Sequence, residues 1–133
     1  MNMGPAVNKK LKMKIKFVQE TNESKFAAEV LHMTMPALVG FLAPWSKPCQ
    51  LIWSVLDEVG DVCEGKVKVF TMNVDDNPDL GTRYAIQSVP TLIFFINGAV
   101  RLKIIGTVSS KAVIAKLLSL TSGNTSTEKT NLE

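Results

Sequence analysis

The chain has 133 residues, of which 46% are hydrophobic and 20% are charged. This length and composition fit one globular domain with an ordinary core, whereas two domains would each be too small. The formal net charge is +3, but five lysines stand among the first sixteen residues, so the rest of the chain is slightly acidic. The excess positive charge therefore describes an N-terminal arm and not the domain.

We predict that residues 1–13 form a flexible basic arm. Such an arm can be drawn to an anionic surface by non-specific attraction, although a solvated start to the first strand is the simpler interpretation. The arm has none of the arginine and aromatic residues expected of a nucleic-acid binder, so no nucleic-acid partner is predicted.

The longest apolar stretches, residues 36–44 and 91–96, are far shorter than the roughly 20 residues of a membrane-spanning helix. The N-terminus has charge but no apolar block followed by a small-residue cleavage site. Cys49 and Cys63 are too few for a disulfide scaffold and fit a reducing compartment. We therefore predict no membrane span and a cytoplasmic location.

The first elements alternate between strand and helix. Residues 14–20 predict a short strand, and Asn22 or Ser24 can cap a helix with one apolar side formed by Phe26, Val30 and Leu31. Residues 36–43, PALVGFLA, are continuously apolar, which is typical of a strand covered on both faces.

A longer helix is predicted from about Cys49 to Val62, with Gly65 as its stop signal. Residues 67–75 read as another strand, and the Asn77-Pro78 turn opens a short helical stretch that reaches about Ala85.

The last elements form a hairpin and a helix. Asn97-Gly98 stands between apolar strands at residues 91–96 and 100–105, and a type I′ turn requires positive φ at both of its central residues. Gly106 ends the second strand, and Ser109 or Ser110 can cap a final helix that places four apolar residues at helical spacing: Val113, Ile114, Leu117 and Leu118.

The predicted order is therefore βαβαβαββα over a domain at residues 14–122. Parallel crossovers followed by an antiparallel hairpin predict an α/β fold with three layers, α/β/α, and a central mixed sheet. Residues 123–133 are polar and lack periodicity, so we predict a disordered tail.

The segment FLAPWSKPC at residues 41–49 resembles the thioredoxin family, whose motif is Trp-Cys-Gly-Pro-Cys. It follows an apolar strand and opens a helix, and Val89-Pro90-Thr91 and the Asn-Gly hairpin follow it in order. The resemblance covers residues 14 to 120. It implies a thioredoxin fold and a cis Val89-Pro90 bond that faces the motif.

Family chemistry needs two thiols at a helix N-terminus, where the first attacks a substrate disulfide and the second resolves the mixed disulfide. Ser46 occupies the position of the attacking thiol, and a hydroxyl does not undergo this exchange. Cys49 matches the resolving cysteine, which the family buries, so we expect a slow nucleophile. Cys63 lies fourteen residues further along the helix, roughly 21 Å away, and cannot pair with Cys49.

Two further positions depart from the family pattern. Thioredoxins carry a buried aspartate on the strand before the motif and a lysine on the adjacent strand, and these positions align with Gly40 and Thr71. The retained positions are those of a binding groove for an extended peptide: Trp45, Pro48, Val89, Pro90 and Gly106. Lys47, beside the motif, can steer acidic partners, although a solvated loop lysine is the simpler interpretation.

Three hypotheses follow from the resemblance. The leading one is a monomeric, cofactor-free protein that is impaired in dithiol-disulfide exchange and binds an extended peptide or protein. The second is a thioredoxin, a protein-disulfide reductase, whose first cysteine has been replaced in this sequence. The third is a one-thiol site at Cys49 that forms mixed disulfides with glutathione or a partner.

Metal binding is not predicted, because Cys49, Cys63 and His32 lack a short ligand spacing. His32 is interpreted as a residue at the end of the first helix, and Trp53 as a packing residue.

Overall fold

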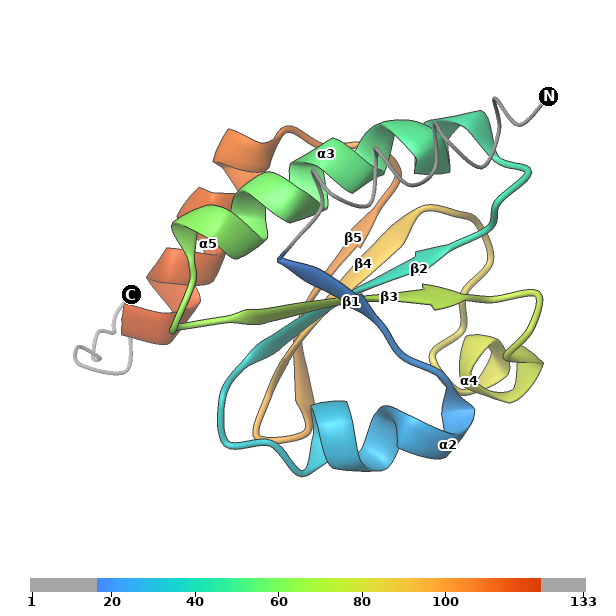
Figure 1. Ribbon diagram of the computed structural model, residues 1–133, viewed down its shortest axis with the longest axis horizontal. Helices are drawn as coiled ribbons and strands as arrows, with labels where there is room; N and C mark the ends of the chain where they lie inside the picture. Colours follow the sequence, from blue (N-terminus) through green and yellow to red (C-terminus); the bar gives the residue numbers. More distant parts are fainter. Residues whose placement is uncertain (1–16, 123–133) are drawn as a thin grey trace, which may run out of the picture.

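The computed structural model describes residues 17–122, whose centre is a five-stranded sheet (Figure 1). The strands follow the order β1-β3-β2-β4-β5 across the sheet. Their bounds are Val18–Glu20 for β1, Ala37–Leu42 for β2, Lys68–Asn73 for β3, Thr91–Ile96 for β4 and Ala99–Ile105 for β5. β1, β3 and β2 are parallel, whereas β4 is antiparallel to both β2 and β5. The predicted mixed sheet is confirmed.

Helices cover both faces of the sheet. Their bounds are Glu23–Phe26 for α2, Ala27–Leu31 for the π-helical segment η1 that continues it, Lys47–Val62 for α3, Pro78–Arg83 for α4 and Ser110–Ser122 for α5. α3 and α5 lie on one side of the sheet, and α2 and α4 lie on the other (Figure 1). This is the predicted α/β/α arrangement of a thioredoxin fold.

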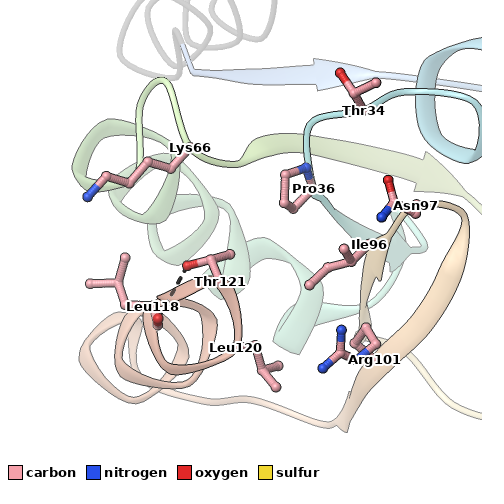
Figure 2. A pocket seen from close by; sticks show the side chains of 9 residues that line it. All are labelled: Thr34, Pro36, Lys66, Ile96, Asn97, Arg101, Leu118, Leu120 and Thr121. Carbon is pink, nitrogen blue, oxygen red and sulfur yellow. Dashed lines mark hydrogen bonds between the residues drawn. The ribbon is translucent and has the colours of Figure 1, made fainter. Parts of the chain in front are cut away.

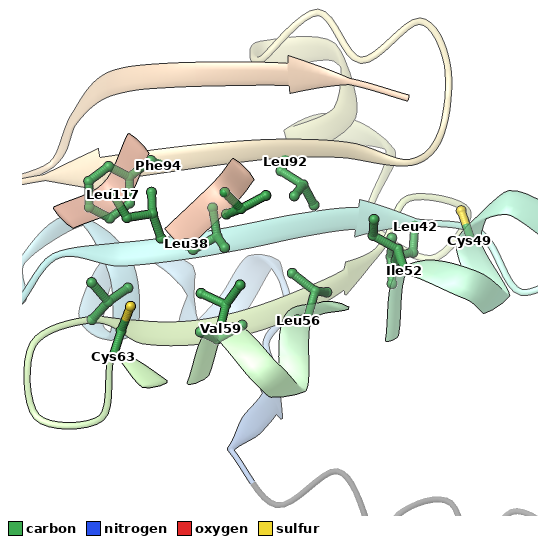
Figure 3. Packing of buried hydrophobic residues seen from close by; sticks show 13 residues of the cluster. Leu38, Leu42, Cys49, Ile52, Leu56, Val59, Cys63, Leu92, Phe94 and Leu117 are labelled. Carbon is green, nitrogen blue, oxygen red and sulfur yellow. The ribbon is translucent and has the colours of Figure 1, made fainter. Parts of the chain in front are cut away.

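Alternate residues of the central strands fill two cores, one on each face of the sheet. On the α3 and α5 face, Leu38, Leu92 and Phe94 pack against Leu56 and Leu117 (Figure 3). On the α2 and α4 face, the core contains four phenylalanines among aliphatic residues: Phe26, Phe41, Phe70 and Phe95. β2 is buried along its whole length, as its continuous apolar sequence predicts.

The structure adds detail to two predicted elements. Within the described residues β1 is Val18–Glu20, and Phe17 lies outside it, with its backbone N–H donating to Asp57 Oδ1 on α3 at 3.1 Å. The first helix is not one regular α-helix, since its last turn is π-helical and the N–H of His32 donates to the carbonyl of Ala27. Residues 14–16, the predicted arm and the predicted tail lie outside the described residues.

The predicted turn and cap signals hold. Asn97 and Gly98 have φ values of 53° and 78°, as a type I′ hairpin requires. Of the two candidate caps at each helix, Asn22 caps α2 by accepting from the N–H of Lys25, and Ser109 caps α5 by accepting from the N–H of Ala112.

The two short helices α2 and α4 cap each other on one face of the sheet. Glu23 Oε2 accepts hydrogen bonds from the N–H groups of Asp79, at 2.8 Å, and Leu80, at 3.4 Å, at the start of α4. In return, Asn77 Oδ1 accepts from the N–H of Glu23 at 2.9 Å. The exchange satisfies N–H groups at two helix starts that are 54 residues apart in sequence.

We expect Glu23→Ala to lower the free energy of unfolding by about 1 to 2 kcal/mol, because two N–H groups of α4 lose their acceptor. Glu23→Gln retains one amide oxygen and should lose less. Urea denaturation measures both, with Glu20→Ala as an exposed glutamate control on β1. Equal losses for Glu20→Ala and Glu23→Ala would contradict the capping role.

None of the helices within residues 17–122 is long and apolar enough to cross a membrane.

Candidate functional site

Four strands bring the segments of the site to one end of the sheet. β2 and β3 are parallel, so their C-terminal residues, Leu42 and Asn73, lie side by side. β4 runs the other way, and its first residue, Thr91, pairs with Phe41 on one side and Ile105 on the other. The loops that follow β2, β3 and β5 and the loop that precedes β4 therefore meet at this end.

Ser46 is the N-cap of α3. Its φ and ψ are −88° and 121°, and its Oγ accepts a hydrogen bond from the N–H of Cys49 at 3.4 Å. Serine is among the preferred N-cap residues, and Pro48 fits the first turn because it has no N–H to satisfy. The helix therefore begins at Lys47, two residues before the predicted start at about Cys49. Ser46 is 5% exposed, so its hydroxyl serves the helix start.

Cys49 lies in the first turn of α3 with its sulfur turned inward. It is 2% exposed and belongs to the core between α3 and the sheet (Figure 3). Its Sγ accepts a hydrogen bond from the N–H of Ala43 at 3.4 Å. Both Cys49 and Cys63 are free thiols, and Figure 3 shows them at opposite ends of the cluster. The prediction that these two residues cannot pair is confirmed.

Trp45 is the most prominent exposed group beside Ser46. Its side chain is 70% exposed, and its Nε1–H donates to Asp75 Oδ2 at 2.8 Å. Sequence reasoning missed Asp75 as a site residue, although its place two residues after β3, at the same sheet end as the motif, was a usable signal. Ile105, which is 66% exposed at the end of β5, was missed as well. Lys47 and Pro48 are also exposed on the first turn of α3.

Val89 and Pro90 lie in the loop before β4, and the peptide bond between them is cis. The N–H of Gly106 donates to the carbonyl of Pro90 at 2.8 Å, which fastens the loop to the end of β5. Val89 is half-buried and packs against the core that contains Cys49. Within residues 17–122, the main-chain N–H and C=O of Val89 make no hydrogen bond.

β5 also holds the start of this loop. Lys103 Nζ donates to the carbonyls of Tyr84, at 2.9 Å, and Ala85, at 3.4 Å, where α4 ends. A lysine at this point satisfies carbonyls that the helix leaves without partners. The loop that carries Val89 is therefore tied to β5 at both ends.

The two positions that depart from the family pattern are neighbours in the sheet. Gly40 on β2 pairs with Thr71 on β3, and both side-chain positions point toward α3. A Cβ built on Gly40 would lie 3.0 Å from Leu56 Cδ1 and 3.3 Å from Leu92 Cδ2. Leucine side chains therefore fill the space beside Gly40 that a buried carboxylate would need.

Cys63 closes α3 at the other end and is fully buried. Burial raises the pKa of its thiol, and the nearby positive charge of Lys66 offsets part of that rise. A raised folded-state pKa means that the unfolded chain loses this proton first. The contribution of the Cys63 thiol to the free energy of unfolding is therefore complete below its ordinary pKa. It is lost as the pH rises through the thiol's pKa in the folded protein.

We expect the stability advantage of the native chain over Cys63→Ala to shrink from roughly pH 8.5 upward, by at most about 1.4 kcal/mol per pH unit. Urea denaturation of both proteins between neutral and alkaline pH measures the difference, and all other titrating groups are common to both. A difference that stays constant with pH would contradict the assignment.

A surface hollow lies at the opposite end of the molecule. It has a volume of about 800 Å³ and lies where α5 ends beside the turn between β4 and β5. Lys66 and Arg101 stand on opposite sides of it (Figure 2). None of the predicted site residues lines it. Among residues 17–122, no three His, Cys, Asp or Glu side chains gather as a metal site would require.

Comparison with known proteins agrees with this geometry. The sequence profile of the thioredoxin family matches residues 17–119. The chain is 43% identical over 94 residues to a thioredoxin M-type, chloroplastic, from Spinacia oleracea, which is 71% of this chain and 52% of the spinach protein. The chain thus spans about half the length of that relative.

Two further relatives are matched over more of their own length. A thioredoxin from Rickettsia felis is 43% identical over 76 residues, 57% of this chain and 72% of that protein. A thioredoxin from Pyropia yezoensis is 36% identical over 100 residues, 75% of this chain and 94% of that protein. Because the family profile covers most of the chain and the fold is the one that it implies, this chain belongs to the thioredoxin family.

Proposed function

We propose that this thioredoxin-family protein binds an extended segment of a protein or peptide and does not by itself carry out dithiol-disulfide exchange. The observation that carries the proposal is the state of the motif. Ser46 stands at the attacking position, 5% exposed and engaged as the cap of α3, and the one sulfur in the motif, that of Cys49, is 2% exposed. The site has a helix start suited to a thiolate but no exposed thiol to use it.

The surroundings of the motif support the same proposal. Resolution of a mixed disulfide requires the second thiol to lose its proton. The family's proton-accepting carboxylate is replaced by Gly40, and Leu56 and Leu92 close the space around it. The change at Ser46 is therefore accompanied by a second change in the core behind it.

The main chain around Val89 supports the binding of an extended segment. The main-chain groups of Val89 are unpaired within the described residues, and the loop around them is fastened to β5 by Gly106 and Lys103. Unpaired N–H and C=O groups on a fixed segment favour pairing with an added extended chain. Trp45 and Ile105 supply exposed apolar surface at the same end of the sheet.

A single-turnover experiment tests the redox half of the proposal. The protein is reduced, freed of reductant and mixed with insulin, and the disulfides reduced per protein molecule are counted by mass spectrometry. We expect no reduction that leaves an intramolecular disulfide in the protein. One equivalent of insulin disulfide reduced per molecule would overturn the proposal in favour of an active reductase.

The proposed binding is tested with reduced and alkylated insulin B chain as an extended polypeptide probe. Amide NMR spectra of the protein are recorded as the probe is added. Expected shifts centre on Trp45, Val89 and Gly106, and no shift at these residues at millimolar probe would contradict the groove assignment.

The alternative at Cys49 has its own readout. A one-thiol site predicts a glutathione adduct on Cys49 after mild oxidation, whereas adduction only at Cys63 would reject it. The hydrogen bond from Ala43 to the Cys49 sulfur favours this alternative over one at Cys63, where burial raises the pKa of the thiol. The monomeric state and cytoplasmic location stay predictions, and the printed name of the spinach relative makes the chloroplast the rival location.

A further inference from the structure

Two adjoining hollows lie at the end of the molecule opposite the candidate site. The larger, of about 800 Å³, is the hollow between the end of α5 and the turn from β4 to β5 (Figure 2). The smaller, of about 290 Å³, lies between β5 and α5, and both are lined by Arg101 and Leu120. We call the two together the β5–α5 hollow. β5 is an edge strand of the sheet, so an extended segment of another chain has room to lie along it.

Every charged side chain that lines the β5–α5 hollow is a cation. Lys66 follows α3, Arg101 lies on β5 and Lys116 lies on α5, and all three are exposed. Residues 17–122 hold nearly equal numbers of acidic and basic side chains, so this grouping is a local feature of the surface. A surface of one sign attracts a partner of the opposite sign.

The three cations are not used to hold the described part of the chain together. Within residues 17–122 their side-chain nitrogen atoms make no hydrogen bond and no ion pair. Lys103, two residues after Arg101 on the same strand, is the contrast, because its Nζ donates to two carbonyls where α4 ends. The cations of the hollow are therefore available to a partner.

The chemistry between the cations favours a polypeptide over other anions. Aliphatic residues make up much of the lining: Ile96, Leu102, Ala115, Leu118 and Leu120. Lys66 and Arg101 lie on opposite sides of the larger hollow and do not converge on one point, as groups that bind a single phosphate do (Figure 2). No aromatic residue lines the hollow, so it has no platform on which a nucleic-acid base could stack.

We propose that the β5–α5 hollow binds an acidic segment of a partner protein that also carries aliphatic residues. The carboxylates of the segment meet the three cations, and its aliphatic side chains meet Leu118 and Leu120. This surface lies at the opposite end of the molecule from Trp45 and Val89. The inference therefore does not depend on the proposed function.

A peptide titration of the full chain tests the binding. The probe is the synthetic peptide EELGELEE, acetylated and amidated, and amide NMR spectra of the protein locate its site. We expect the largest shifts at residues 96–102 and 115–121. The basic peptide KKLGKLKK should cause no shift there, and EESGESEE, which lacks leucine, should bind about fivefold more weakly. Largest shifts at Trp45 and Val89 instead would overturn the proposal and leave the proposed function standing.

Removal of the cations separates a docking site from general attraction. Lys66→Gln combined with Arg101→Gln should weaken binding of EELGELEE about fivefold. Lys25→Gln combined with Arg83→Gln makes the same charge change on α2 and α4 and should leave the affinity unchanged. Equal weakening by the two pairs of substitutions would overturn the proposal.

Other occupants of the hollow have their own signatures. Inorganic phosphate that shifts the same amides at the same concentration as the peptide would indicate a site for small anions. Shifts of these amides on dilution of the protein alone would indicate a second copy of the chain. Shifts caused by deletion of residues 124–133 would indicate the end of the chain itself. Each of these three results would overturn the proposal of a separate acidic partner.

Discussion

We expect Ser46→Cys to reduce insulin and the unmodified chain not to. Removal of an enzyme's nucleophile typically costs several orders of magnitude in rate, so we expect a gain on the order of 10³-fold over the unmodified chain. Cysteine and serine have the same shape, and the position is the cap of α3, where free N–H groups and the helix dipole stabilise a thiolate. Residues three apart at a helix start are also close enough for the introduced thiol to form a disulfide with Cys49.

The new reductase should still be slow at its second step. Cys49 is buried and has no carboxylate behind it, because the aligned position is Gly40. The mixed disulfide between the variant and insulin should therefore accumulate and be visible by mass spectrometry before the intramolecular disulfide forms. Burst and steady-state rates of insulin reduction, compared with the amount of adduct, separate the two steps.

Ser46→Ala is the matched control for this prediction. It removes the cap oxygen and costs roughly 1 kcal/mol of stability, and it supplies no thiol. A variant Ser46→Cys that reduces insulin no faster than Ser46→Ala would show that the helix start cannot support the chemistry. Equal activity of the unmodified chain and Ser46→Cys would instead refute the proposed loss of exchange.

Local sequence signals predicted most of the fold, because they act within a few residues. The Asn97-Gly98 turn requires only that two adjacent residues accept positive φ, and the structure has that turn. The continuous apolar run of β2 predicted a strand buried on both faces for an equally local reason. Family resemblance then assembled these elements into a thioredoxin fold.

The structure differs from the sequence-based predictions where contacts join distant parts of the chain. Phe17 was predicted in the first strand but lies outside β1, and its N–H donates to Asp57, forty residues away. Trp45 was identified, but its partner Asp75 lies thirty residues away, and only the sheet brings them together. The mutual capping of Glu23 and Asn77 likewise joins helices that no local pattern relates.

The observed start of α3 lies two residues before the predicted start at about Cys49 for another reason. Ser46 was interpreted only as a missing nucleophile. Serine is also a strong N-cap, and with Pro48 in the first turn this signal predicts a helix that begins at Lys47, as observed. Because Ser46 was interpreted only by its chemistry, its structural role as an N-cap was missed.

Gly40→Asp, the change that would return the family's carboxylate, should destabilise the protein by about 4 kcal/mol or more. The first side-chain atom already meets Leu56 and Leu92 at 3.0 and 3.3 Å, and the carboxylate beyond it would enter an apolar core. Gly40→Ala brings the crowding without the charge and should cost about 1 to 3 kcal/mol. Urea denaturation measures the loss of stability in each variant. Similar losses for Gly40→Asp and Gly40→Ala would contradict a penalty for burying the charge.

Lowering the pH should reduce the difference in the free energy of unfolding between Gly40→Asp and Gly40→Ala. Burial would raise the pKa of the new carboxyl, so its penalty is largest above that value and falls as the carboxyl takes up a proton at lower pH. Leu56→Ala should cost less stability in the Gly40→Asp background than in the unmodified chain, because it opens space beside the carboxylate. If Gly40→Asp alone were tolerated and also accelerated the second step of Ser46→Cys, one substitution would suffice to restore the centre. We expect the opposite, because the core has closed over the place where that carboxylate would act.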